Sequence, residues 1–217
     1  MISLNTKKRI FTSLILFTVI FLIYYSKIFL VLSLLILSVV SLLEFFNISK
    51  RLFNSFLYKS LANILFILFI SFFSIMFFYF SSFLHLKIIL FSLLLGCVAS
   101  DIGGYLVGNT FKGPKLTKIS PNKTVSGSVG SIIFTCLTFS LIIFFFTNNL
   151  NLSLIMVGFF TSISCQIGDL FFSYLKRKVK IKDTGNFLPG HGGILDRVDG
   201  ILFGIPFGFL SLVLIFQ

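Results

Sequence analysis

The sequence predicts an all-α polytopic integral membrane protein with about seven transmembrane helices. Of its 217 residues, 57% are hydrophobic, 11% are charged and 32 are Phe, and the mean hydropathy is +1.07. Soluble globular domains are about half apolar and about a quarter charged, so this chain falls outside that class. Apolar runs of about 20 residues, the length that crosses a hydrocarbon core of about 30 Å, recur along the chain.

Seven apolar runs define the expected spans: residues 10–25, 28–47, 61–84, 88–107, 128–147, 152–175 and 198–216. The first span is short and meets the second across Ser26 and Lys27. Basic residues before it imitate a signal peptide, but no small-residue cleavage site follows Tyr25, so we expect an uncleaved first helix. No soluble domain or linker interrupts the pattern, and the expectation is a single membrane domain over residues 1–217.

The distribution of basic residues predicts the orientation in the membrane. With the N-terminus cytoplasmic, all of the 18 Lys and Arg except Lys27 and Lys87 fall on the cytoplasmic side. Such a bias is typical of cytoplasmic loops, and it places the C-terminus outside. The net charge of +12 therefore largely reflects the topology. A more specific interpretation of the same charge is a basic face that binds anionic lipid or nucleotide phosphate. Because the basic residues lie in short loops between spans, the sequence indicates no nucleic-acid partner.

The acidic residues all fall in one layer near the cytoplasmic face of the predicted topology; they are Glu44, Asp101, Asp169, Asp183, Asp196 and Asp199. At about 1.5 Å per residue, Asp101 and Asp169 lie roughly 9 Å inside the boundary. A carboxylate within a span is costly unless it faces a polar interior and has a partner. That partner is a loop Lys or Arg, or a divalent metal such as Mg²⁺, which also binds substrate phosphates. The alternative is an Asp–Arg network that only locks helices together.

Two predicted cytoplasmic loops, residues 108–127 and 176–197, have the composition of anion-binding segments. Both are rich in Lys and Gly, and glycines let backbone N–H groups approach a phosphate. The start of the last span, after Gly192 and Gly193, offers the positive end of a helix to the same ligand. Asp196 and Asp199 share a helix face there, although such a pair can also simply cap the helix. Farther along, glycines at positions 200, 204 and 208 indicate close helix packing.

One longer pattern covers residues 173–199 and reads Ser173-x-x-Lys176-Arg177-x4-Lys182-Asp183-x-Gly185-x-x-Leu188-Pro189-x-His191-Gly192-Gly193-x-x-Asp196-Arg197-x-Asp199. It resembles the signature of the phosphatidate cytidylyltransferases, also called CDP-diacylglycerol synthases, with every fixed position filled. Shorter stretches around Asp101, Lys123 and Asp169 agree, so the resemblance spans about residues 100–200, the expected catalytic region. The chain departs from the family pattern in three places: Val125-Ser126 stand where Trp-Glu is common, Phe172 where Glu is common, and Gly200 where Ser is usual.

The resemblance implies a Mg²⁺-dependent nucleotidyltransferase of phospholipid biosynthesis, which transfers the cytidylyl group of CTP to phosphatidate and releases pyrophosphate. A phosphate monoester has a second pKa of about 6, so no general base is needed. His191 is expected to donate a hydrogen bond to phosphate, with a role in ordering the loop as the alternative. Asp169 and Asp196 are the expected metal ligands. The expected catalytic residues are Asp169, Asp196, Lys176, Arg177, Lys182, His191 and Arg197. The expected substrate-binding residues are Lys123, Ser120, Thr124, Asp101, Asp183, Gly192, Gly193 and Asp199.

Two alternatives stay open. The first is a cytidylyltransferase for another lipid phosphate, of the ether or polyprenyl type. The second, in a different class, is an ion- or proton-coupled transporter, which should place its ionisable residues near the midplane with access from both faces. The one-sided layer of carboxylates favours an enzyme whose active site faces the cytoplasm. The size and topology of the chain suggest the bacterial cytoplasmic (inner) membrane as its location. Stripes of small residues make a homodimer a further expectation.

Overall fold

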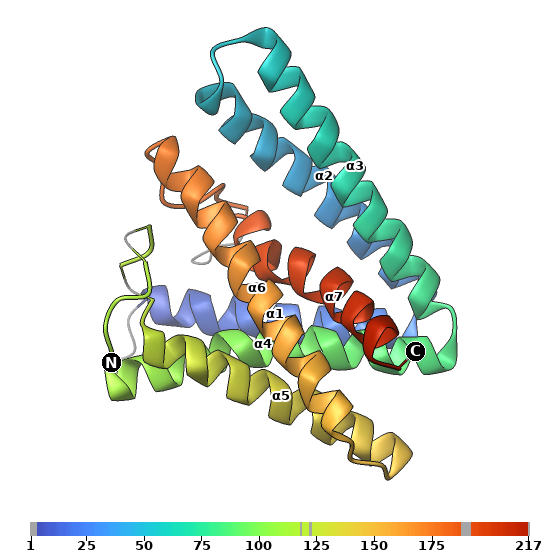
Figure 1. The fold of residues 1–217 in the computed structure, drawn as a ribbon. Coiled ribbons are helices and arrows are strands. Elements are labelled where there is room, and N and C mark those ends of the chain that lie inside the picture. The colour runs from blue at the N-terminus through green and yellow to red at the C-terminus, as the bar shows by residue number, and fades with distance from the viewer. Residues whose placement is uncertain (1–3, 118, 122, 188–191, 217) are drawn as a thin grey trace. The chain divides into compact units, whose positions relative to one another are not determined.

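The computed structural model describes residues 4–117, 119–121, 123–187 and 192–216. These residues form seven helices, which are α1 (Leu4–Tyr25), α2 (Lys27–Leu52), α3 (Phe56–Ser81), α4 (Leu84–Phe111), α5 (Val125–Thr147), α6 (Leu152–Lys178) and α7 (Leu195–Phe216) (Figure 1). An isolated antiparallel β-bridge pairs Lys115 with Thr124. The predicted all-α class and the order of the seven helices are confirmed.

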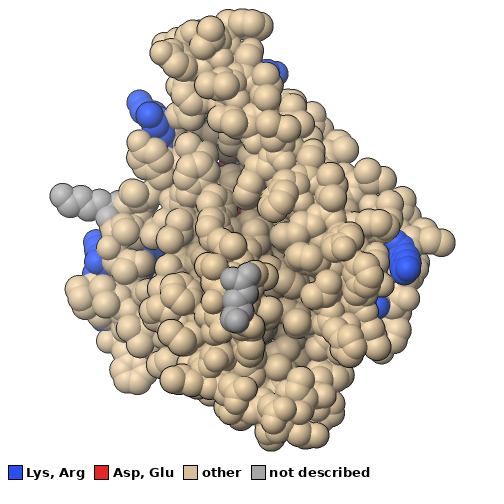
Figure 2. All heavy atoms as spheres, turned by 45° about the vertical axis from the view of Figure 1, so that its right-hand side comes forward, with Lys and Arg blue, Asp and Glu red and all other residues tan. Residues whose placement is uncertain are grey.

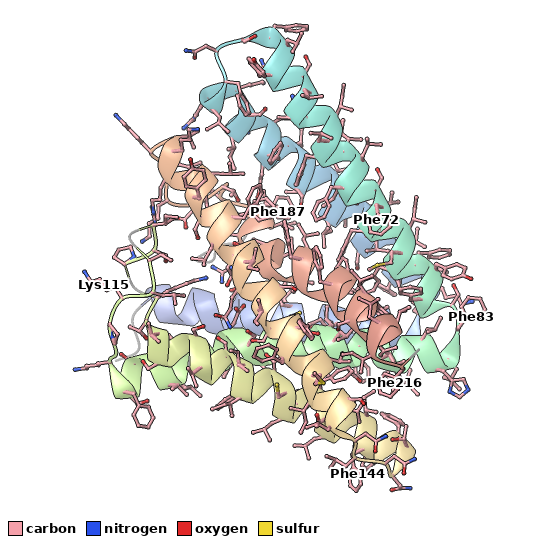
Figure 3. All side chains as sticks on the ribbon, in the orientation of Figure 1. Phe72, Phe83, Lys115, Phe144, Phe187 and Phe216 are labelled. Carbon is pink, nitrogen blue, oxygen red and sulfur yellow. The ribbon has the colours of Figure 1, made fainter. Side chains whose placement is uncertain are left out.

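The helices have the length and surface of membrane spans. Six of them, α2 to α7, are long and apolar enough to cross a membrane, and Leu14–Tyr25 in α1 is a shorter apolar helix. Large apolar side chains are exposed on both α3 and α5, as Phe72 and Phe144 illustrate (Figure 3). The face in Figure 2 is almost entirely uncharged, with Lys and Arg atoms in small patches. So much exposed apolar surface is suited to lipid rather than water, and the chain is an integral membrane protein.

Several helices extend beyond the apolar runs from which they were predicted. α2 continues to Leu52, past the predicted end at residue 47, and α7 begins at Leu195, ahead of residue 198. Hydropathy marks the part of a helix that lies in lipid, whereas caps decide where the helix ends. Thr124, for example, accepts a hydrogen bond from the N–H of Gly127 at 3.1 Å and starts α5 three residues earlier than the hydropathy suggests.

The chain divides into two compact units. The first unit comprises Met1–Tyr79 and Leu175–Val198, and the second comprises Phe80–Tyr174 and Asp199–Gln217. The first unit therefore contains α1, α2, nearly all of α3, and the α6–α7 loop with the helix ends on either side of it. The second unit contains α4, α5 and most of α6 and α7. The expectation of a single membrane domain with a catalytic region at residues 100–200 stays a prediction.

In the first unit, α2 and α3 form an antiparallel hairpin (Figure 1). Near the loop of this hairpin, the Ser49 hydroxyl donates to Asn63 Oδ1 at 2.6 Å. Farther along, the hydroxyls of Ser38 and Ser74 lie 2.9 Å apart. Hydroxyl contacts of this kind are common between membrane helices, where no water competes for them. Glu44 lies on α2 between these two contacts and is buried.

In the second unit, small residues bring α4 and α5 into backbone contact. The Ser131 hydroxyl donates to the backbone carbonyl of Ser100 at 2.8 Å. A Cβ added at Gly103 would lie only 2.7 Å from the carbonyl oxygen of Gly130, which is closer than any real side chain tolerates. The two helices therefore pack by the small-residue mechanism of membrane proteins.

The glycines at positions 200, 204 and 208 bring α7 close to its neighbours in the second unit. A Cβ at Gly200 would lie 2.6 Å from Cys165 Sγ of α6, and one at Gly204 would lie 2.6 Å from Cys97 Sγ of α4. At Gly208 the nearest atom would be Thr161 Oγ1, at 2.7 Å. The predicted packing role of this glycine stripe is confirmed.

Candidate active site

The predicted site residues gather in two places, one in each unit. In the first unit, Asp196 collects hydrogen bonds from three donors, and we call these residues (Lys176, Thr184, Gly193 and Asp196) the Asp196 cluster. In the second unit, Asp169 lines a cavity, which we call the Asp169 cavity. The two places differ in burial and in the kind of donor that contacts the carboxylate.

Both oxygens of Asp196 are bound by protein donors. Oδ1 accepts from Lys176 Nζ at 2.7 Å, and Oδ2 accepts from the backbone N–H groups of Thr184 and Gly193 at 2.8 and 3.0 Å. The side chains of Asp196 and Lys176 are only 6% and 11% exposed. A buried carboxylate is tolerated when it is paired and hydrogen-bonded in this way. Asp196 thereby ties the end of α6, the following loop and the start of α7 together.

Gly192 makes this arrangement possible. Its φ of +82° lies in the left-handed region that favours glycine. A Cβ at this position would also lie 2.9 Å from Asp196 Oδ2. Gly192 was predicted as a substrate-binding residue, and the structure shows a second reason for a glycine at this position.

Glu44 is a site residue that the sequence analysis placed in the carboxylate layer without giving it a role. It accepts from the Thr184 hydroxyl at 2.6 Å and from the N–H groups of Ile194 and Leu195 at 3.0 and 2.9 Å. The available sequence signal was a lone acid within an apolar run, since no other Asp or Glu occurs before Asp101.

The start of α7 therefore differs from the phosphate-binding helix end that the sequence suggested. The N–H group of Gly193 donates to Asp196, and those of Ile194 and Leu195 donate to Glu44. Helix N-termini attract anions, and in this structure the carboxylates of Asp196 and Glu44 accept the hydrogen bonds at this helix end.

The other predicted residues of the first unit leave charged groups on the surface. Arg177 donates to the carbonyl of Ile181 at 3.3 Å and is exposed. Lys182, Asp183 and Arg197 are exposed as well. His191 lies outside the described residues, so its expected contact with phosphate stays a prediction.

The Asp169 cavity has a volume of about 310 Å³ and lies within the second unit. Side chains of α4, α5, α6 and the α4–α5 loop line it. It brings together five of the predicted site residues, Asp101, Ser120, Lys123, Thr124 and Asp169. Two carboxylates, a cation and hydroxyls around one cavity are suited to phosphate or metal–phosphate ligands.

Lys123 and Asp169 form the central ion pair of this cavity. Lys123 Nζ lies 2.9 Å from Asp169 Oδ2, and the two side chains are 33% and 19% exposed. The α4–α5 loop carries Lys123 back toward α6, because the N–H of Leu116 donates to the Lys123 carbonyl at 2.8 Å. The same loop carries Lys115, which is exposed (Figure 3).

Ser126, which stands where the family commonly has Glu, orders the base of this loop. Its hydroxyl accepts from the N–H of Gly113 at 3.2 Å and lies 3.1 Å from the Thr124 hydroxyl. Thr124 in turn caps α5. The neutral hydroxyl of Ser126 thus helps to order this loop at the position where the family commonly has a Glu.

The other two departures from the family pattern belong to tight packing. Phe172, in place of Glu, is 1% exposed and packs edge-on against Phe203, with ring centroids 6.3 Å apart. At Gly200, in place of Ser, a Cβ would lie 3.0 Å from Asp169 Oδ1 as well as against Cys165. The close approach of α7 to α6 therefore requires glycine at this position.

Two further residues complete the second unit's polar interior. Asp199 is buried, and its Oδ1 accepts from the N–H of Gly200 at 3.0 Å. Gln166, which the sequence analysis missed, lines the cavity and accepts from the Ser128 hydroxyl at 2.5 Å. A single Gln in an apolar span was the sequence signal for it.

No group of three or more His, Cys, Asp or Glu side chains that could hold a metal is found among the described residues. The donor chemistry of the Asp169 cavity nevertheless fits Mg²⁺. This ion takes one or two carboxylates and fills its remaining positions with water and substrate phosphates. Asp169 and Asp101 supply such oxygens at the cavity wall. Asp169 and Asp196 belong to different units, and their role as metal ligands stays a prediction.

Comparison with known proteins identifies the family. A family model described as "Cytidylyltransferase family" matches residues 51–215. The phosphatidate cytidylyltransferase of Bacillus subtilis (strain 168) is 43% identical over 120 residues, which are 54% of this chain and 44% of that protein.

Two other curated relatives carry the same name. The Mycobacterium leprae (strain TN) protein is 42% identical over 113 residues, 52% of this chain and 36% of that protein. The Helicobacter pylori (strain J99 / ATCC 700824) protein is 39% identical over 112 residues, 52% of this chain and 42% of that protein. The matched region spans less than half the length of these relatives. Because the family model matches most of the chain, and in agreement with the resemblance seen in its sequence, this protein belongs to the cytidylyltransferase family.

Proposed function

We propose that this protein transfers the cytidylyl group of CTP to phosphatidate, giving CDP-diacylglycerol and pyrophosphate. The observation that carries the proposal is the Asp169 cavity, in which Lys123 and Asp169 form an ion pair beside Asp101 and loop hydroxyls. This cavity lies in the part of the chain that the family model matches. Relatives named phosphatidate cytidylyltransferase support the choice of substrates.

Basic side chains would bring the two polyanionic substrates together. Lys123 lines the Asp169 cavity, and Arg177, Lys182 and Arg197 are exposed basic residues of the first unit. The lipid phosphate, with a second pKa of about 6, is already a dianionic nucleophile at neutral pH. Its attack on the α-phosphorus of CTP forms the new P–O bond as the bond to pyrophosphate breaks. Positioning and charge neutralisation therefore carry most of the catalysis, as in phosphoryl transfer generally.

Mg²⁺ is the proposed cofactor, with Asp169 and Asp196 as its ligands. When bound, the metal would neutralise charge on the transferring phosphate and the departing pyrophosphate. Asp169 is 19% exposed and lines a cavity, which supports its part in this proposal. To bind the metal, Asp196 would have to exchange its contact with Lys176 for a contact with the ion.

The same proposal includes the orientation and location of the protein. The N-terminus and the loops at residues 108–127 and 176–197 would be cytoplasmic, and the C-terminus would be outside. CTP would then reach the site from the cytoplasm and phosphatidate from the inner leaflet of a bacterial cytoplasmic membrane. The bacterial origin of the relatives supports this location.

A labelled-lipid assay tests the proposal. The purified full chain in mixed lipid–detergent micelles is given CTP labelled at the α-phosphate, phosphatidate and Mg²⁺. We expect the label in a chloroform-soluble lipid, loss of the product in EDTA and recovery with added Mg²⁺. No labelled lipid from well-folded protein would contradict the proposed reaction.

Parallel samples separate the alternatives. Ether-lipid phosphate and polyprenyl phosphate replace phosphatidate in two of them, and product with one of these alone would assign the enzyme to that lipid. Proteoliposomes that move ions or protons without forming a labelled lipid would assign the protein to the transporters.

A further inference from the structure

We infer that Glu44 is a positioning residue for the proposed transfer reaction: from α2 it holds the loop that presents Lys176 and Asp196. The inference rests on the proposed function for its kinetic part, whereas its structural part is independent of the reaction. Glu44 binds the hydroxyl of Thr184 and the backbone N–H groups of Ile194 and Leu195, so it acts through the loop rather than on the substrate.

Glu44 and Asp196 share the same short stretch of backbone. The N–H group of Gly193 donates to Asp196, while those of the next two residues, Ile194 and Leu195, donate to Glu44. Successive N–H groups thus bind two different carboxylates. A shift of either carboxylate must move the backbone that binds the other.

Thr184 couples the two carboxylates a second time. Its hydroxyl donates to Glu44 Oε2 at 2.6 Å, and its backbone N–H donates to Asp196 Oδ2 at 2.8 Å. Thr184 is buried, as is Glu44. Glu44 therefore binds the α6–α7 loop at two separate points, at Thr184 and at the start of α7.

The loop is shaped to admit this one side chain. A Cβ at Gly185 would lie 2.7 Å from Glu44 Oε1, and a Cβ at Gly193 would collide with both Glu44 and Thr184. The three donors that contact Glu44 are uncharged. Its negative charge instead lies at the N-terminus of α7, the positive end of the helix dipole. The same position is therefore closed to a substrate phosphate.

Replacement of Glu44 tests the kinetic part. Glu44→Ala removes all three contacts, and we expect kcat for labelled-lipid formation to fall by about 10- to 100-fold, the usual effect of losing a supporting contact, with a smaller change in KM for CTP. Glu44→Gln should fall between Ala and the parent, because its carbonyl still accepts while its NH₂ group faces a donor. Ser41→Ala is the matched control, since Ser41 is buried on the same helix and its hydroxyl has no hydrogen-bond partner among the described residues.

Limited trypsin digestion tests the structural part without relying on activity. The loop offers Lys180 and Lys182 as cleavage sites, and the exposed Lys115 in the other unit serves as an internal reference. We expect Glu44→Ala and Glu44→Gln to be cut faster at Lys180 and Lys182, with cleavage at Lys115 unchanged. Ser41→Ala should be cut like the parent.

The outcomes distinguish the two proposals. If the parent forms no labelled lipid but the variants show selective loop cleavage, the proposed reaction fails and the loop-holding role of Glu44 stands. Full activity of both Glu44 variants in an active preparation overturns the inference. Equal acceleration of cleavage at every site also overturns it, because that result indicates a general loss of fold.

Discussion

The two aspartate–lysine pairs of this protein have the same chemistry and different surroundings. Asp196 and Lys176 lie 2.7 Å apart, are 6% and 11% exposed, and share the carboxylate with two backbone N–H groups. Asp169 and Lys123 lie 2.9 Å apart, are 19% and 33% exposed, and line a cavity.

The difference shows how one kind of ion pair serves two purposes. A buried pair is costly to break, by about 3–5 kcal/mol, because the remaining charge is left without compensation. A partly exposed pair contributes about 1 kcal/mol or less, so a ligand can exchange with it at little cost. We therefore interpret the Asp196 pair as a framework for the α6–α7 loop and the Asp169 pair as the accessible part of the site.

Asp196→Asn should have the largest effect. The amide offers one acceptor and turns an NH₂ group toward a donor, while Lys176 loses its counter-ion. We expect the free energy of unfolding to fall by about 3–5 kcal/mol and the incorporation of CTP into lipid to be nearly abolished. Denaturant titration in micelles, followed by circular dichroism, and the labelled-lipid assay measure the two effects. Parent-like stability with retained activity would refute the role assigned to Asp196.

Asp169→Asn should separate activity from stability. The pair it breaks is partly exposed, so we expect unfolding to change by about 1 kcal/mol or less. Activity should fall by about 10² to 10³, the range seen when one preorganised charge contact is removed. Lys123→Met, which breaks the same pair from the other side, is the companion variant for stability. A destabilisation as large as that of Asp196→Asn would show that the two pairs do not differ as we describe.

Ser126→Ala should have the smallest effect. It removes the hydroxyl that accepts from Gly113 and contacts Thr124, at a cost of about 1 kcal/mol for one hydrogen bond. We expect a small fall in the thermal midpoint and an activity loss below about 10-fold, because Lys123 is held less firmly over Asp169. Ser126→Thr keeps the hydroxyl and should match the parent. An unchanged Ser126→Ala protein would mean that this contact does not order the loop.

The fold class followed from the sequence because membrane spans obey a local rule. The thickness of the hydrocarbon core sets the length of an apolar run, so all seven helices and their order were predictable. The ends of the helices were not, because polar caps such as Thr124 extend helices past the lipid-facing part.

The candidate site was predictable in its residues and less so in their partners. The sequence alone indicated the pattern over residues 173–199 and the carboxylates Asp169 and Asp101. Five of the predicted residues do line one cavity. The departures at Phe172 and Gly200 could be understood only from packing, since a sequence does not say which neighbour lies a few ångströms away.

By itself, the sequence determined the membrane class, the helix order and the family, since each depends on residues that are close together in the chain. Only the tertiary structure decided which carboxylate is buried, which faces a cavity and which donors each one binds. Glu44 shows the physical reason: its partners Thr184, Ile194 and Leu195 lie 140 to 151 residues away along the chain. Hydrogen bonds act over about 3 Å in space, and only folding brings such distant residues within that distance.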